Sequence, residues 1–513
     1  MHLYIPWLLL SIPVLPAIAG MLARHLSAAS AARLSIAAAA ASLVIAAAAC
    51  VGLAMGGPLT ARWMPLGADS SFSLSLRLDV VSAVMVLLVS FLGFIVVRFS
   101  KNYLAGDPHQ ARFCSWMALT LASVLTLVLS GNLLLILATW ITTSLSLHRL
   151  LLHYPDRAGA IFSARKKFVV SRLGDLSLAI ALLLVYRHYG TWDLETLFAT
   201  IQNGDTAGLP LTCVFLAACA ALKSAQFPFH SWLPDTMETP TPVSAFMHAG
   251  IINAGGFLIV RLSPLFVHAP GALATLAILG TLTAAFGAIV MLAQPGVKRA
   301  LAYSTIAQMG FMILQCGLGA FGLALLHIVA HSLYKAHAFL HAGSTIGAVP
   351  RAAVPLKTPA LLLGLLAGAA LVAGGAFAIA ALAPSSEIHL GVFALVFAFA
   401  LAYGLARAWS AGGTKRTAIL GAGVATAIVL IGLVLHAGST AFFAHLPNVT
   451  PSPFAVGFAT VTFTALFFFQ ALLWRAGHHA LGRRLYVHAL NGFYVGTYAN
   501  RLLGWLWPRH QIG

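Results

Sequence analysis

The sequence predicts an all-α integral membrane protein with about 14 to 15 transmembrane helices. Charged residues make up 8% of the 513 residues and hydrophobic residues 60%, whereas a soluble domain carries about 25% charged residues. Apolar runs of about 20 residues, the length that an α-helix needs to cross the hydrocarbon core, recur along the whole chain. The expected spans begin near residues 5, 31, 79, 111, 132, 167, 208, 242, 272, 300, 320, 358, 389, 417 and 454.

The placement of basic residues predicts the orientation of these helices. The chain has 29 Lys and Arg against 11 Asp and Glu, a formal net charge of +18. Most of the basic residues fall in connections that follow odd-numbered spans; Arg62, Arg77, Arg187 and Arg261 follow even-numbered ones. The positive-inside rule therefore places the N-terminus outside the cell and the C-terminus in the cytoplasm. On this interpretation the charge reports topology and contact with anionic membrane lipid, and we expect no nucleic-acid partner.

The first three spans are expected to be scaffold. They run from Ile5 to about Arg98 with almost no polar side chains, and the alanines after Ile36 let helices approach closely. The N-terminus lacks the positively charged region of a cleaved signal peptide, so the first span is expected to remain. The five cysteines lie in apolar runs without metal-ligand spacing and are interpreted as core residues. The external segment from about Gly56 to Asp79 receives no functional assignment.

A polar stretch between apolar runs is the first candidate functional site. Its titratable side chains are Lys223, Asp235, Glu238 and His248, and its prolines are Pro228, Pro234, Pro240 and Pro242. Ionisable groups at bilayer depth are costly and by default mark an ion path. Broken helices occur there only where the freed backbone is buried in protein or lines a cavity. Burial disfavours the ammonium form of a lysine, so Lys223 is expected to exchange a proton, unless it snorkels to the interface.

Two groups that precede this stretch have open interpretations. Arg172 and Asp175 are three residues apart on one expected helix, and their pair either is structural or polarises a neighbouring lysine. Span five carries hydroxyl side chains that either line water or bond the preceding helical turn. These residues are Thr139, Thr142, Thr143, Ser144 and Ser146.

The eleventh span contains a second cluster of titratable residues. His327, His331 and Lys335 follow one another at intervals of four residues, so they lie along one helix face. His337 and His341 form another such pair on a different face. The favoured interpretation is a proton relay. A zinc site and ordinary polar contacts between helices are the alternatives, and zinc would need further ligands.

The C-terminal segment, residues 476–513, mixes bulky apolar with basic side chains. It is too short and too polar to cross a membrane. We therefore expect it on the cytoplasmic surface as an interfacial helix or a docking site for a partner.

Several of these stretches together resemble the proton-pumping module shared by antiporter-like subunits of complex I and the large subunit of Mrp antiporters. They are Phe168–Asp175, Lys223–His248, Lys298–Thr305 and His327–Lys335. The resemblance implies two inverted five-helix repeats with broken helices, and it implies that Lys223, His248, His327, His331 and Lys335 line the ion path. The resulting division is residues 1–110 for the first helices, 111–265 and 266–410 for the two repeats, 411–475 for the last helices and 476–513 for the tail.

The local sequence of three segments most resembles that of the DabB family, the membrane subunits of inorganic-carbon accumulation complexes. The relevant segments are Phe227–Pro234, Met247–Pro264 and Leu485–Tyr494. This resemblance implies a bacterial inner-membrane protein with a cytoplasmic DabA-like zinc partner that resembles β-carbonic anhydrase. Cation flow, expected to be of protons, would energise the hydration of carbon dioxide to bicarbonate. The chain itself would then be no enzyme and would hold no cofactor, because the zinc belongs to the partner.

Two positions depart from the wider antiporter pattern. Ile141 follows Trp140 where that pattern has a glutamate that pairs with the lysine of the seventh helix, here Lys223. The twelfth span, Thr358–Ala383, has no lysine where the pattern has one. The lost glutamate gives weight to a membrane anchor without ion flow, which is kept as an alternative function. An antiporter-type subunit of a complex I or Mrp assembly is the other alternative. Asp175, Asp235 and Glu238 are the candidate acidic partners of Lys223.

Overall fold

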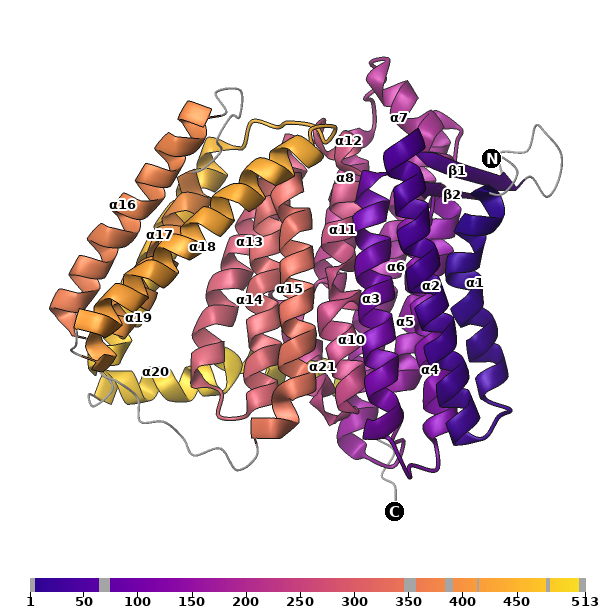
Figure 1. Ribbon diagram of the computed structural model, residues 1–513, viewed down its shortest axis with the longest axis horizontal. Coiled ribbons are helices and arrows are strands. Elements are labelled where there is room, and N and C mark those ends of the chain that lie inside the picture. Colours follow the sequence, from indigo (N-terminus) through magenta and orange to yellow (C-terminus); the bar gives the residue numbers. More distant parts are fainter. Residues whose placement is uncertain are drawn as a thin grey trace.

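The computed structural model describes residues 5–63, 74–345, 357–382, 391–412, 415–476 and 480–506. Long helices run side by side in these segments (Figure 1), and the predicted class is confirmed. Thirteen helical segments of the described chain are long and apolar enough to cross a membrane. The shorter or more polar α8 and α14 take the places of the two remaining predicted spans.

The helices occur in the predicted order. The first part of the chain contains α1 (Ile5–Ala23), α2 (Ala28–Gly56), α3 (Val80–Tyr103), α4 (Gln110–Leu129), α5 (Leu133–Leu151) and α6 (Ala158–Tyr189). The middle part contains α7 (Leu194–Gln202), α8 (Leu209–Lys223), α9 (Trp232–Asp235), α10 (Thr241–Ala249), α11 (Ala254–Arg261), α12 (Ser263–Phe266), α13 (Pro270–Ala293), α14 (Val297–Gly317) and α15 (Phe321–His341). The last part contains α16 (Thr358–Leu382), α17 (Gly391–Gly412), α18 (Lys415–Phe442), α19 (Pro453–Ala476), α20 (Ala480–Leu490) and α21 (Val495–Leu506). Short 3-10 turns are η1 (Phe229–Ser231), η2 (Thr236–Glu238), η3 (Ile251–Asn253), η4 (Ala342–Thr345) and η5 (Gly492–Tyr494).

Polar side chains mark where several helices begin. Asp79 accepts a hydrogen bond from the backbone amide of Ser82 at 3.0 Å and caps α3. Asn132 caps α5 by accepting from the amides of Leu134 and Leu135. Such caps satisfy amides that have no partner within the helix.

A small β-hairpin is the one departure from an all-helical class among the described residues. Strands β1 (Leu59–Trp63) and β2 (Leu74–Leu78) pair in antiparallel register, with Leu59 opposite Leu78. The hairpin lies at the same end of the bundle as α7 and α12 (Figure 1). Both strands lie within the segment from about Gly56 to Asp79 that was expected to be external.

The helix break after Lys223 is present as predicted. Helix α8 ends at Lys223, and Ala225 adopts a left-handed conformation with φ 50°. The chain then continues through η1, α9 and η2 before α10 begins. A second break at η3 separates α10 from α11. Gly255 lets α11 approach α8, because a Cβ there would collide with the carbonyl of Ala220 and the hydroxyl of Ser224.

The packing divides the bundle into a large core and a lateral group. The largest cluster of buried apolar side chains extends from α1 to α15. A smaller cluster joins α17 and α18 and contains Leu401, Leu405, Ala425 and Val429. Helices α16 to α19 accordingly lie to one side of the rest (Figure 1).

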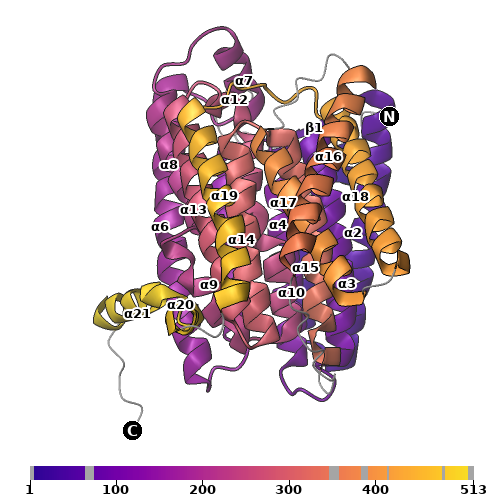
Figure 2. The same cartoon turned by 90° about the vertical axis from the view of Figure 1, so that its left-hand side faces the viewer.

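The two described C-terminal helices do not run along the bundle. α20 and α21 lie across its lower end, opposite the end that carries the hairpin (Figures 1 and 2). The side-chain amide of Gln294 donates to the carbonyl of Leu490 at 3.1 Å, and this bond holds the end of α20 to the end of α13. The described part of the tail therefore lies across one end of the bundle, and its cytoplasmic location and docking role stay predictions.

Candidate functional site

Lys223 lies at the end of α8 with its ammonium group over an aromatic ring. Its Nζ atom is 4.5 Å from the centroid of the Trp140 ring on α5. Helix α8 has 15 residues, which corresponds to about 22 Å of rise, so Lys223 lies well inside a hydrocarbon core about 30 Å thick. The placement argues against a lysine that snorkels from the end where α8 begins.

Asp175 lies on α6, which packs against α8, the helix that ends at Lys223. Asp175 also forms an ion pair of 2.7 Å with Arg172 one helical turn away. The pair is present, and its role, structural or polarising for a neighbouring lysine, stays a prediction. That Asp175 is an acidic partner of Lys223 stays a prediction.

The other two candidate acids lie elsewhere. Asp235 pairs with Lys166 at 2.8 Å, and that lysine also donates to the side chain of Asn500 at 2.6 Å. Glu238 is about half exposed and lies 3.9 Å from Arg157. The structure therefore places both acids at the end of the bundle that carries α21, and their role in an ion path stays a prediction.

Lys167 is a buried basic residue that the sequence analysis did not single out. It is 4% exposed, and its Nζ atom donates to the carbonyl and hydroxyl of Ser144 at 2.7 and 2.9 Å. Consecutive residues of a helix point about 100° apart, so the three basic residues from Arg165 to Lys167 cannot all face the surface. The run of three basic residues in one helix could therefore have indicated that one of them faces the bundle. The positive charge at this helix start was interpreted only as a sign of membrane orientation.

Two of the hydroxyls of α5 bond their own helix. Thr139 donates to the carbonyl of Leu135 at 2.6 Å, and Thr142 donates to that of Thr139 at 3.2 Å. This is the alternative in which they bond the preceding turn. Ser144 differs because it faces α6 and binds Lys167.

The second cluster lies where α10, α14 and α15 meet. His248 is fully buried, lies 3.1 Å from the hydroxyl of Thr305, and stacks on Phe339 with ring centroids 4.4 Å apart. Lys335 is also fully buried, and it donates to the carbonyl of Leu301 at 3.3 Å. The structure thus brings together residues that the sequence places on separate spans.

The predicted faces of α15 are observed. His327 lies 2.9 Å from the side-chain oxygen of Gln315, and its ring centroid is 6.0 Å from that of His331. His331 is 5% exposed, and neither of its ring nitrogens has a hydrogen-bond partner in the described structure. His337 and His341 stack on each other on an exposed face. Among the described side chains, no three metal-ligating residues converge.

Hydrogen bonds connect the surroundings of the two lysines. Ser224, next to Lys223, donates to the carbonyl of Ile252 at 2.9 Å. The following residue, Asn253, donates to the hydroxyl of Ser332 on α15 at 2.9 Å. Ser332 lies between His331 and Lys335 in the sequence. The break at η3 therefore links α8 to the second cluster through polar groups.

A separate polar cluster lies outside the spans, between α3 and α4. Asp107 accepts hydrogen bonds from the amide of His109 at 2.7 Å and from the hydroxyl of Tyr154 at 3.1 Å, and it pairs with His153 at 3.3 Å. Burial opposes ionisation, but these hydrogen bonds together hold the pKa of Asp107 below its usual value. Burial also lowers the pKa of His153, against the opposing effect of Asp107.

Two family descriptions match the chain. The family described as NADH:quinone oxidoreductase/Mrp antiporter, transmembrane, matches residues 130–362. The N-terminal region of complex I chain 5 matches residues 63–114. The first match contains the candidate side chains of α6, α8, α10 and α15.

Proteins with similar sequences carry two kinds of name. The probable inorganic carbon transporter subunit DabB2 of Halothiobacillus neapolitanus is 38% identical over 85% of this chain and 81% of its own length. The corresponding DabB of Hydrogenovibrio crunogenus is 43% identical over 52% of each chain. NADH-ubiquinone oxidoreductase chain 5 of Metridium senile is 37% identical over 56% of this chain and 48% of its own length.

Solved structures share the fold. A chain of the Mrp complex from Dietzia sp. DQ12-45-1b matches 99% of this chain over 60% of its own length, with a TM-score of 0.66 and 24% identity. A chain of an archaeal membrane-bound sulfane sulfur reductase matches 98% of this chain with a TM-score of 0.60 and 17% identity. At these identities the likeness describes the fold alone.

Proposed function

The chain belongs to the DabB family of inorganic carbon transporter subunits, and from this premise we propose that it conducts protons to energise carbon accumulation. The energy would drive a cytoplasmic, DabA-like zinc partner that hydrates carbon dioxide to bicarbonate. In this proposal the chain is the transport and coupling subunit, and the zinc chemistry takes place on the partner.

The observation that carries the proposal is the set of titratable side chains inside the helix bundle, at the depth expected for the membrane. Lys223 and Lys335 lie on different helices, and the hydrogen bonds at η3 connect their surroundings. Ionisable residues inside a membrane bundle are costly and by default belong to an ion or proton path. Lysine and histidine exchange protons, whereas hard metal cations prefer clusters of oxygen ligands, so the proton is the favoured ion.

The positive-inside rule supports an orientation for this path. It favours a cytoplasmic location for the end of the bundle that carries α20 and α21, in a bacterial inner membrane. That end also carries the ion pair of Lys166 with Asp235. A partner bound there would contact the segment that follows Lys223.

Growth of a carbonic-anhydrase-deficient host in ambient air tests the proposal. We expect the chain and its partner together to restore growth, and an uncoupler or Lys223→Met to abolish it at unchanged protein level. Lys357→Met makes the same change at an exposed position and should leave growth intact. Full rescue by Lys223→Met would instead support a membrane anchor without ion flow.

A subunit of a complex I or Mrp assembly is the second candidate. The match of residues 130–362 and the relationship to NADH-ubiquinone oxidoreductase chain 5 favour it, whereas Ile141 in place of the glutamate counts against it. Purification from native membranes separates the two. A large zinc-containing partner would support carbon accumulation, and NADH-linked or several small hydrophobic subunits would support the second candidate.

A further inference from the structure

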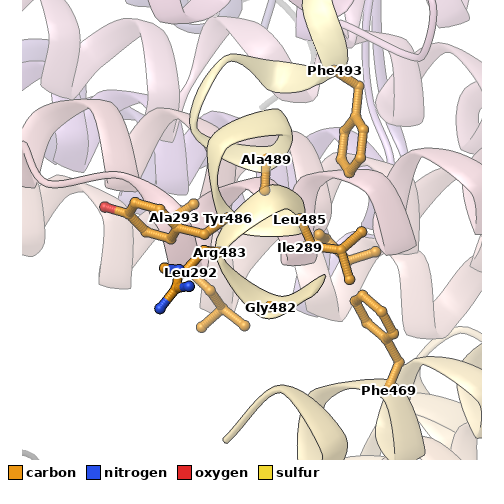
Figure 3. Close-up of a pocket in the computed structure, with 10 residues that line it drawn as sticks. All are labelled: Ile289, Leu292, Ala293, Phe469, Gly482, Arg483, Leu485, Tyr486, Ala489 and Phe493. Carbon is orange, nitrogen blue, oxygen red and sulfur yellow. The ribbon is translucent and has the colours of Figure 1, made fainter. Parts of the chain in front are cut away.

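A cavity of about 460 Å³ lies between α20 and the ends of two spanning helices. Ile289 and Leu292 of α13 and Phe469 of α19 contribute apolar walls. Figure 3 shows Arg483, Tyr486 and Leu292 on one side of the cavity and the rings of Phe469 and Phe493 on the other. The cavity is therefore apolar inside and has a guanidinium group at one edge.

A second, basic depression shares that arginine. It measures about 360 Å³ and is lined by Arg483, Arg484, Val487 and His488. Arg483 borders both hollows, so an apolar compartment and a basic compartment adjoin. An amphiphile with one anionic end and one hydrocarbon end would complement this pair.

The position of the two hollows at the membrane surface favours a membrane lipid over other amphiphiles. α20 lies across the ends of α13 and α19 (Figure 2), where spanning helices meet the membrane surface. Leu292 is 51% exposed beside the cavity, and Leu472 of α19 is 60% exposed. Exposed apolar side chains on spanning helices face acyl chains, so the cavity lies at the boundary where lipid tails and headgroups meet.

We propose that this site binds one anionic phospholipid of the surrounding leaflet, with an acyl chain in the cavity and its phosphate on Arg483 and Arg484. Paired guanidinium groups bind phosphate oxygens through charge-assisted hydrogen bonds. Basic pockets beside spanning helices on the cytoplasmic side suit anionic headgroups. The volume lies within the range of about 300–1,000 Å³ that is usual for small-molecule sites.

The bound lipid would contact the tail where it meets the broken helix. Phe493, which lines the cavity, has its ring centroid 6.0 Å from that of Phe286. Phe286 in turn lies 4.5 Å from the ring of His230 in η1, within the break that follows Lys223. Occupancy of the site should therefore stabilise the docking of α20 and α21. This inference does not depend on which ion the protein conducts.

Thermal unfolding of the purified full chain in a neutral detergent tests the site. Dioctanoyl phosphatidylglycerol should raise the midpoint by about 3 °C or more, and dioctanoyl phosphatidylcholine and glycerol phosphate at equal concentration should not. The first comparison isolates the headgroup charge, and the second excludes a free phosphate. Equal stabilisation by phosphatidylcholine, or by glycerol phosphate alone, would overturn the proposal.

Variants locate the effect on the chain. Arg483→Gln with Arg484→Gln should weaken phosphatidylglycerol binding at least about tenfold, because hydrogen bonds to charged groups are lost. Ala489→Phe should fill the apolar compartment and abolish binding. Arg501→Gln removes an arginine of α21 whose side chain stacks on Tyr498 and should bind like the parent chain. If Arg501→Gln weakened binding as much as the double variant, the lipid would be attracted by tail charge in general and the proposed site would be wrong.

Discussion

The ammonium group of Lys223 on α8 lies 4.5 Å from the centroid of the Trp140 ring on α5, and Ile141 follows that tryptophan. A ring face stabilises a cation without adding a negative charge. Asp175, a candidate acidic partner, lies on α6 and pairs with Arg172 at 2.7 Å. The protein therefore places an aromatic face beside its central lysine.

Trp140→Leu should impair proton-coupled carbon uptake while the chain remains in the membrane. A desolvated cation–π contact contributes about 2 kcal/mol, so we expect uptake of labelled inorganic carbon to fall at least about tenfold. Trp116→Leu is the matched control, because the Trp116 ring lies 5.8 Å from the guanidinium of Arg149 near the end of α5. Equal losses in both variants would show that the tryptophans matter only for packing.

Lys167→Met should lower uptake strongly, since Lys167 is a basic residue buried inside the bundle against Ser144 of α5. Ser144→Ala should have a smaller effect, because the bond from Lys167 to the backbone carbonyl remains. Lys101→Met makes the same change at an exposed position and should be silent. Uptake that is unchanged in Lys167→Met, at normal protein level, would leave Lys167 a structural residue.

His331→Gln and His337→Gln should separate the two faces of α15. His331 is buried beside His327, whereas His337 is exposed. Removal of a positioned proton carrier typically costs about 10²–10⁴-fold in rate, so proton flux into vesicles should fall by at least that lower factor only in His331→Gln. A similar flux in the two variants would contradict a relay along this face.

Asn500→Leu should loosen α21, because Asn500 accepts a hydrogen bond from Lys166 at 2.6 Å. Hydrogen bonds to charged groups contribute about 1.5–3 kcal/mol, and limited proteolysis of the tail should accelerate about tenfold or more. Asn491→Leu removes only a bond within α20, to the carbonyl of Val487, and should change the rate little. The opposite order of rates would mean that α21 is held by other contacts.

Asp107→Asn should reduce thermal stability near neutral pH and much less in acid. The folded state lowers the pKa of Asp107, so its carboxylate stabilises the fold above an unfolded pKa of about 3.9. That contribution disappears as the pH falls through the lowered folded-state pKa. Melting curves of parent and variant should therefore converge in acid, whereas the exposed Asp156→Asn should track the parent throughout. A difference that stays constant from pH 7 into acid would exclude an electrostatic origin.

Several of these contacts could be anticipated, and others could not. The break after Lys223 follows from its prolines, and the common face of His327, His331 and Lys335 follows from helical periodicity. The burial of Lys167 did not follow, because the face that a residue at a helix start presents depends on its neighbours. Likewise, Asp235 and Glu238 lie close to Lys223 in sequence, but the turns after the break carry them to the end of the bundle.

The sequence by itself determined the membrane class, the order of the spans, the helix break and the residue types of the candidate path. It could do so because apolar length, proline and periodicity act over short stretches of chain. Only the tertiary structure decided that the Trp140 ring lies against Lys223, and that α20 closes a cavity against α13 and α19. These relationships depend on how helices distant in sequence pack, and in lipid small residues and polar contacts set that packing.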